Sequence, residues 1–155
     1  MQLISGERFT GTDCSNKQLE EARVADVVLD GCRLTGLALH GGSLRDVVVR
    51  DCRADLVSLT ECGLERVTFE ACVLTQADFL DARLVDVRFE RCDLSGADFR
   101  GARLTGCELH GCALDGVVGV ESLRGAKMPW ADIVGAAGVL AGALGIEVLD
   151  EGGDA

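Results

Sequence analysis

The sequence predicts an all-β solenoid, in which the chain winds into stacked coils of parallel strands. Three observations predict it: an apolar residue recurs at every fifth position, a small residue stands two positions before each apolar one, and the residue types of one unit recur four units later. Neither the 3.6-residue period of a helix nor the two-residue period of an ordinary strand explains this pattern. A five-residue period needs a bend in every unit.

The five-residue frame runs without an insertion from Val24 to Leu114. All nineteen of its central positions are apolar, and twelve of them are leucine. The positions two residues earlier hold Cys, Ala and Val, apart from Leu37 and Gly42. Residues spaced by two point the same way from a strand, so both sets are predicted to face inward. The Gly and Asp residues between them are predicted to turn the corners.

A second period, of 20 residues, sets the number of units in one coil. It is marked by a column of cysteines: Cys32, Cys52, Cys72, Cys92 and Cys112. Four units therefore complete a coil, and residues 20 apart stack at about 4.8 Å, the spacing of paired strands. Each of the four walls takes its name here from one central residue: the Leu84 wall (Val24, Leu44, Leu64, Leu84, Leu104), the Phe89 wall (Leu29, Val49, Phe69, Phe89, Leu109), the Leu74 wall (Leu34, Ala54, Leu74, Leu94, Leu114) and the Phe79 wall (Leu19, Leu39, Leu59, Phe79, Phe99).

Two units carry a resemblance to a known family. Ala77-Asp78-Phe79-Leu80-Asp81 and Ala97-Asp98-Phe99-Arg100-Gly101 are similar to the A-(D/N)-(L/F)-x-x signature of the pentapeptide repeat family. The resemblance covers about residues 7–118. It implies the fold of that family, a right-handed quadrilateral parallel β-helix.

The frame is irregular at both ends. In the first coil, Glu7, Thr12 and Lys17 occupy the small inward positions and Cys14 a central one. That coil must be loose or must turn polar side chains outward. After Leu114 the frame slips by one residue, and the five-residue spacing passes to Val118, Leu123 and Met128, with Ala126 as the small residue before Met128.

The C-terminal segment predicts a helix over about residues 129–144, which caps the β-helix of residues 1–128. Pro129 suits the first turn of a helix and Gly145 its end. The rest of residues 129–149 is expected to form a tail, and residues 150–155 are expected to be disordered. Because apolar residues cover most of the helix circumference, one side is expected to cover the last coil and another to pair with a second copy. The candidates for a homodimer contact are Trp130, Ile133, Val134, Ala137, Leu140 and Leu144.

Composition narrows the classes of function. The net charge of −11 disfavours direct binding of nucleic acid or of anionic membranes and favours a protein partner with a basic surface. No apolar stretch reaches the length of a membrane span, and the N-terminus does not resemble a signal peptide, so a cytoplasmic protein is expected. Its eight cysteines are then expected to be free, buried thiols.

No constellation of catalytic or cofactor-binding residues stands out in the sequence. A straight column of cysteines does not converge on the tetrahedron that zinc requires, so neither a metal nor another cofactor is expected. His40 and His110 are predicted to point outward from opposite walls, where they cannot share a proton relay. The sequence therefore predicts a binding protein rather than an enzyme.

The Phe79 wall is the candidate binding surface because its charge is the most negative. It carries six carboxylates against two basic residues, whereas the Leu84 wall has net charge +1. The candidate partner-binding residues are Glu20, Glu21, Glu61, Asp78, Asp81 and Asp98.

The resemblance gives this acidic surface one specific interpretation. Acidic members of the pentapeptide repeat family resemble rods of B-DNA and occupy the DNA-binding saddle of DNA gyrase, which protects gyrase from quinolones. Residues 7–118 carry net charge −7, whereas B-DNA of the same length, about 26 Å, carries about 15 negative charges. Modulation of gyrase or a topoisomerase by DNA mimicry is therefore one interpretation. An interaction scaffold with another protein partner is the alternative.

Overall fold

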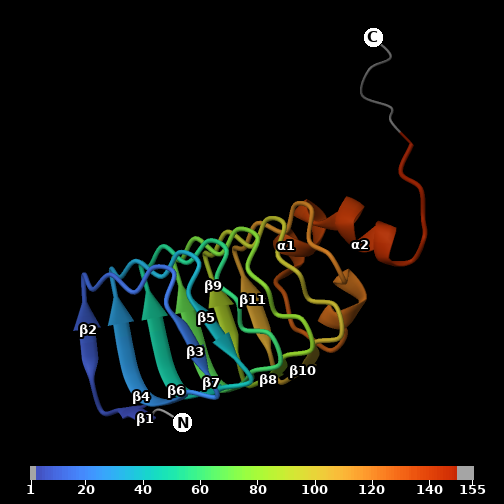
Figure 1. The fold of residues 1–155 in the computed structure, drawn as a ribbon. Coiled ribbons are helices and arrows are strands. Elements are labelled where there is room, and N and C mark those ends of the chain that lie inside the picture. Colours follow the sequence, from blue (N-terminus) through green and yellow to red (C-terminus); the bar gives the residue numbers. More distant parts are fainter. Residues whose placement is uncertain (1–2, 150–155) are drawn as a thin grey trace.

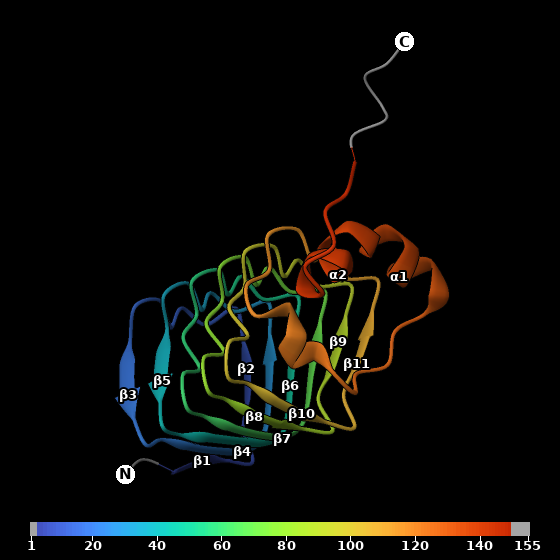
Figure 2. The same ribbon diagram turned by 90° about the vertical axis from the view of Figure 1, so that its right-hand side faces the viewer.

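The computed structural model describes residues 3–149 and shows a parallel β-solenoid with a small helical part at its C-terminal end (Figure 1, Figure 2). The strands are β1 (Leu3–Ser5), β2 (Arg8–Thr10), β3 (Gln18–Glu20), β4 (Arg23–Asp30), β5 (Ala38–His40), β6 (Ser43–Arg50), β7 (Gly63–Glu70), β8 (Arg83–Val85), β9 (Arg88–Glu90), β10 (Arg103–Thr105) and β11 (Glu108–His110). A 3₁₀ helix, η1 (Val120–Leu123), precedes the helices α1 (Trp130–Gly135) and α2 (Ala137–Ala143). Residues 150–155, for which disorder was expected, lie outside the described residues.

Every strand pairing is parallel and joins residues 20 apart, which confirms the 20-residue coil. The eight-residue strands β4, β6 and β7 each run along the Leu84 wall and continue around a corner onto the Phe89 wall. The Leu74 wall is joined by isolated bridges, such as Arg33 with Arg53, and the Phe79 wall by the β3–β5 pair and further bridges.

The corners are formed by residues in the left-handed region of the backbone. The residue two positions after each central one has a positive φ, as in Asp81 (φ 56°) and Gly101 (φ 70°). The backbone N–H of Asp81 donates to the carbonyl of Arg100 in the next coil at 2.9 Å. At this corner the chain changes direction without leaving the N–H unpaired, and the prediction that Gly and Asp turn corners is confirmed.

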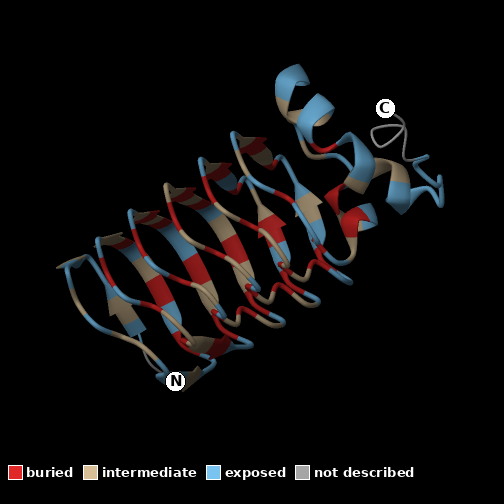
Figure 3. Ribbon diagram, turned by 90° about the horizontal axis from the view of Figure 1, so that it is seen from above, coloured by how far each residue is buried: buried red, intermediate tan, exposed pale blue. Residues whose placement is uncertain are grey.

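The core is a narrow column of inward-facing side chains, and Figure 3 shows the buried positions repeating from coil to coil. Four phenylalanines fill its C-terminal half. Phe69 stacks on Phe89 with ring centroids 5.1 Å apart, and Phe79 stacks on Phe99 at 4.8 Å. Rings from the two opposite walls meet edge to face, for example Phe79 and Phe89 at 5.8 Å. Phenylalanines from opposite walls therefore interleave across the core.

The C-terminal end of the frame slips by one residue, but at a different place from the one expected. Lys127 bridges to Glu108, an offset of 19, and the slip is thus confirmed. Leu123 is buried and Met128 half-buried, as predicted, whereas the expectation that Val118 faces inward is wrong. The five-residue frame continues for one more unit, to the buried Val117. The one-residue slip of the frame then occurs at η1.

The C-terminal helix is divided in two rather than continuous over 129–144. α1 ends at Gly135 and α2 begins at Ala137. Glycine weakens a helix interior, and the Ala136 side chain between the two helices is buried against the solenoid. The predicted stop at Gly145 is confirmed: Gly145 has φ 73°, its N–H donates to Gly142, and the next N–H donates to Ala141. This arrangement is a Schellman motif.

Candidate protein-binding surfaces

The acidic residues of the Phe79 wall divide into a flat row and a corner column. Asp78 and Asp98 lie side by side on neighbouring coils of the flat face. Glu21, Glu61 and Asp81 are corner residues with positive φ, at the edge shared with the Leu84 wall. Glu20 and Glu21 belong to the first coil, and the following coil presents His40 and Gly41 at the corresponding positions, so they are separated from the other four candidates.

Hydrogen bonds remove part of the free charge that was counted on this wall. The Asp98 carboxylate accepts two N–H groups of the Arg100 guanidinium, at 2.7 and 3.0 Å, and the Arg100 backbone N–H at 2.9 Å. The bond from the Arg100 side chain lowers the pKa of Asp98. Asp78 accepts the backbone N–H of Leu80 at 2.8 Å. Of the six candidates, Asp78 and Asp98 are thus the two whose carboxylates accept hydrogen bonds from described residues.

Glu61 faces a histidine rather than an arginine. Its carboxylate lies 3.4 Å from His40 Nε2, and both side chains are exposed. Glu21 and Asp81 take part in no ion pair with the residues that the structure describes. The corner column thus gives a line of negative charge on a rigid edge.

The adjacent Leu84 wall carries five arginines, and the sequence did not show which of them form ion pairs. Arg66 is held by Asp46 at 2.6 Å and by Glu65 at 2.7 Å. Among residues 3–149, no carboxylate pairs with the other four arginines of this wall, Arg23, Arg45, Arg83 and Arg103. The acidic corner column is therefore bordered by a basic face.

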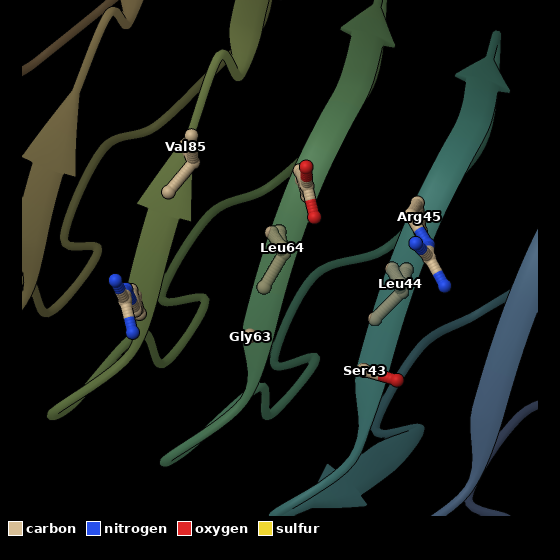
Figure 4. A pocket seen from close by; sticks show the side chains of 8 residues that line it. Ser43, Leu44, Arg45, Gly63, Leu64 and Val85 are labelled. Atoms are coloured by element: carbon tan, nitrogen blue, oxygen red, sulfur yellow. The ribbon is translucent and has the colours of Figure 1, made fainter.

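A shallow hollow of about 560 Å³ lies on this basic face. It arises because Gly63 has no side chain in the outward row that contains Ser43 and Arg83. Figure 4 shows Ser43 and Gly63 on neighbouring strands, with Arg45 beside them. The hollow is an open depression on the outer surface and does not form an enclosed site.

All eight thiols are free, as predicted, but the prediction that all are buried holds for six, because Cys14 and Cys112 are half-buried. Cys32, Cys52, Cys72 and Cys92 are buried and Cys112 is half-buried at the C-terminal end of the column. Each sulfur bonds to backbone carbonyls: Cys52 Sγ, for example, donates to Leu29 at 3.4 Å or to Arg50 at 3.2 Å. No group of three or more side chains able to hold a metal ion occurs within residues 3–149.

The two histidines lie outward on the opposite walls that were predicted. His40 is beside Glu61 on the Phe79 wall, and His110 Nε2 lies 2.8 Å from Glu108 on the Phe89 wall. The core separates them. Each is therefore paired with its own glutamate, and the two have no common site.

The C-terminal helices cover the last coil with one side and expose the other. The Asp132 carboxylate accepts the Gly111 N–H at 2.7 Å, and Ala136, Val139 and Leu140 pack on the solenoid. Among the six predicted dimer residues, Trp130 is 76% exposed and Leu144 79%. Val134 and Ala137 are also exposed, whereas Ile133 and Leu140 are half-buried.

The exposed apolar patch extends beyond the predicted residues. Ile146, Val148 and Leu149 follow the helix and are exposed. Their alternation with Gly145 and Glu147 gave no helical signal, so the sequence pattern missed them. No helix within residues 3–149 has both the length and the apolar composition that a membrane crossing requires.

Comparison with known proteins bears on the fold and the family. The family model described as pentapeptide repeat region matches residues 55–118. Full-length QnrB1, a plasmid-mediated fluoroquinolone resistance protein, is 14% identical, with a TM-score of 0.38 over 93% of this chain and 100% of that one. HetL of Nostoc sp. strain PCC 7120, a pentapeptide repeat protein involved in heterocyst differentiation regulation, is 18% identical, with a TM-score of 0.29 over 79% of this chain and 64% of that one.

A pentapeptide repeat protein from the thylakoid lumen of Arabidopsis thaliana is 18% identical, with a TM-score of 0.34 over 86% of this chain and 76% of that one. No curated protein matches the chain. The match to the family model shows that residues 55–118 are similar to a pentapeptide repeat region, and the same five-residue frame runs without a break from Val24 to Leu114.

Proposed function

We propose that this chain is a non-enzymatic protein-binding module whose acidic corner column meets a basic surface of another protein. The observation that carries the proposal is the position of Glu21, Glu61 and Asp81 on one edge of the solenoid, where positive φ values fix their backbone. Charges on a rigid support lose little conformational entropy on binding. Complementary charge mainly raises the association rate and makes it sensitive to salt.

A DNA-binding protein is the first partner to test, and DNA gyrase is the specific candidate. The family resemblance and the net charge of −11 favour mimicry of DNA. The unpaired arginines of the Leu84 wall weigh against it, because B-DNA presents negative charge on every side. If the chain binds gyrase through one acidic edge, the arginine face points away from gyrase, and the unpaired arginines are then compatible with DNA mimicry. The alternative remains a scaffold for a different basic partner.

The test measures gyrase supercoiling with purified protein and a pair of matched variants. The first replaces Glu21, Glu61 and Asp81 with Lys. The control replaces Asp26, Asp51 and Asp86 with Lys; these are also exposed carboxylates at positive-φ corners, so both variants change the charge and the backbone context equally.

We expect the wild type and the control to inhibit supercoiling and the first variant to lose inhibition without a change in melting temperature. Equal loss in both variants would show that net charge acts rather than this edge. No effect of wild-type protein in several-fold excess, on either supercoiling or quinolone sensitivity, would refute the gyrase proposal. A pull-down with the first variant as the negative control then identifies the basic partner.

We also propose that two copies associate through the exposed apolar patch at the C-terminal end. Trp130 and Leu144, near the two ends of the helical segment, expose large apolar side chains to solvent. Exposed apolar patches of this kind mark interfaces more often than single exposed residues do. The eight free cysteines favour a reducing compartment, and we place the protein in the cytoplasm.

A further inference from the structure

The N-terminal end of the solenoid encloses an apolar cavity that has no part in the acidic edge or the C-terminal patch. Its volume is about 320 Å³, and it is lined mainly by aliphatic side chains of the first three coils. The deepest lining residue is Phe69. Among residues 3–149, the helices cover only the C-terminal end, and Figure 1 shows the first coil, with β1 and β2, as the opposite end of the molecule.

The cavity exists because the central side chains are smaller in this half of the core. On the Phe89 wall, Phe9, Leu29, Val49 and Phe69 follow one another in register, so two aliphatic residues lie between two aromatic ones. On the Leu74 wall, Ala54 stands where the neighbouring coils have leucine. Protein interiors are normally close-packed. A cavity at these positions is therefore a candidate binding site for an apolar ligand.

The depth of the cavity follows from the coil spacing. Phe9 lies in the first coil and Phe69 three coils further on, which is about 14 Å at 4.8 Å per coil. The core beyond Phe69 is closed: Phe79, Phe89 and Phe99 are fully buried and stacked. The cavity is therefore a blind channel along the solenoid axis, open at the first coil and closed by Phe69.

The mouth of the channel carries its polar groups. Thr12 and Lys17 line the cavity from the small inward positions of the first coil. The Lys17 ammonium group forms no ion pair with a described residue. The neighbouring Asp13 is engaged in its own turn, where its carboxylate accepts the Ser15 N–H at 2.9 Å. The mouth thus offers the positive charge of Lys17 above an apolar channel.

We propose that this channel binds a free linear fatty acid of about ten carbons, with the alkyl chain along the axis and the carboxylate at Lys17. Ligand cavities begin at about 300 Å³ and are mostly apolar with a few polar groups. An apolar cavity of about 150 Å³ binds benzene, so a cavity about twice as large suits a chain of about ten carbons. A narrow channel selects an unbranched chain over a bulky ring system.

The first experiment is a calorimetric titration of the full chain with saturated fatty acids from hexanoate to tetradecanoate, each below its micelle concentration. We expect one site, an affinity that rises about fourfold with each added CH₂ group, and no further gain once the chain reaches Phe69. Decanol, which lacks the carboxylate, measures the contribution of Lys17. Lys17→Gln should lower the affinity for decanoate about threefold, the effect of an exposed ion pair, and leave decanol binding unchanged.

A cavity-filling variant separates this site from the exposed apolar patch at the other end. Val49→Phe continues the Phe69–Phe89 stack into the channel, so it should abolish decanoate binding while preserving or raising the melting temperature. Leu59→Phe continues the Phe79–Phe99 stack of the opposite wall and serves if the first variant does not fold. A C-terminal change, Leu144→Ser, should leave decanoate binding intact.

The cysteines supply an independent readout. Cys14 lines the cavity and Cys112 lies at the far end of the core; both are half-buried thiols. Decanoate should slow alkylation of Cys14 and leave that of Cys112 unchanged. Absence of decanoate binding, or equal binding by wild type and both Phe variants, would overturn the proposal. So would association of two copies through the first coil with no effect of decanoate.

Discussion

Replacement of Phe79 by alanine tests the inward and outward assignment on which every surface described above depends. Phe79 is fully buried, stacks on Phe99 at 4.8 Å and meets Phe69 and Phe89 edge to face. A buried Phe→Ala change costs about 3–5 kcal/mol. Because three aromatic neighbours each lose a contact of about 0.5–1.5 kcal/mol, we expect the upper half of that range, about 4–5 kcal/mol.

The assay is thermal and chemical unfolding, with two comparison variants. For a chain of this size, each kcal/mol lowers the melting temperature by about 2–4 °C, so Phe79→Ala should lower it by about 8–20 °C. Phe79→Leu keeps an apolar side chain of the type found at most central positions and should cost about 1–2 kcal/mol. Asp78→Ala removes the acceptor of the Leu80 N–H and should cost about 1 kcal/mol. Equal losses for Phe79→Ala and Asp78→Ala would refute the assignment.

Four further predictions follow from backbone geometry, thiol burial and the C-terminal patch. Leu56 is 54% exposed and has φ 60°. The left-handed region costs a non-glycine residue about 1–2 kcal/mol, whereas glycine loses about 0.5–1 kcal/mol through backbone entropy. In denaturant titrations, Leu56→Gly should therefore raise the free energy of unfolding by about 0.5–1 kcal/mol, and a decrease would contradict the corner geometry. Burial raises the pKa of the Cys62 thiol to about 11, so its contribution to stability is complete below pH 9 and is lost as the pH rises through 11, by about 1.4 kcal/mol per pH unit. The difference in unfolding free energy between the wild type and Cys62→Ala should therefore be constant below pH 9 and should shrink between pH 9 and 11. Thiol titration should find eight reactive cysteines in denaturant and mainly the two half-buried ones in the folded protein, and a consistent disulfide would be incompatible with this. Light scattering should show a dimer that Trp130→Ser with Leu144→Ser converts to a monomer, whereas Leu3→Ser, an exposed leucine at the other end, should not; a monomeric wild type would exclude the dimer.

The regular part of the fold could be predicted because two periods fix every position within it. Once residues 20 apart are stacked, the five-residue frame decides which side chains face inward, and the buried residues between Val24 and Leu114 follow that frame. Where the period stops, the prediction lost its basis. Nothing in the spacing shows that the missing residue falls at η1 rather than at Val118, or that Ala136 divides the C-terminal helix.

The candidate binding surface could be predicted only in part, because the five-residue frame gives the position of a charged residue but not its partners. Periodicity places Glu61 and Asp81 on one corner and Asp78 and Asp98 on one face, but it does not show which charges are neutralised. Asp98 bonds to Arg100, two residues away in the same unit, so it contributes less free charge than a count of carboxylates gives. The cavity depends on side-chain volume. Ala54 and the absence of central phenylalanines between Phe9 and Phe69 indicate in the sequence that this part of the core is less filled. The sequence does not show that the unfilled space is continuous.

The unbroken 20-residue register makes the length of the rod and the arrangement of its faces separately adjustable. Insertion or deletion of 20 residues changes the length by one coil, about 4.8 Å, and leaves every later side chain on its own wall. A change of five residues keeps the five-residue frame but moves every later side chain to the neighbouring wall. With the five-residue change placed between Glu21 and Glu61, Glu61 and Asp81 would leave the corner formed by Glu21 while keeping their own spacing. A partner that contacts one edge over several coils can therefore accommodate rods of different length only in steps of whole coils.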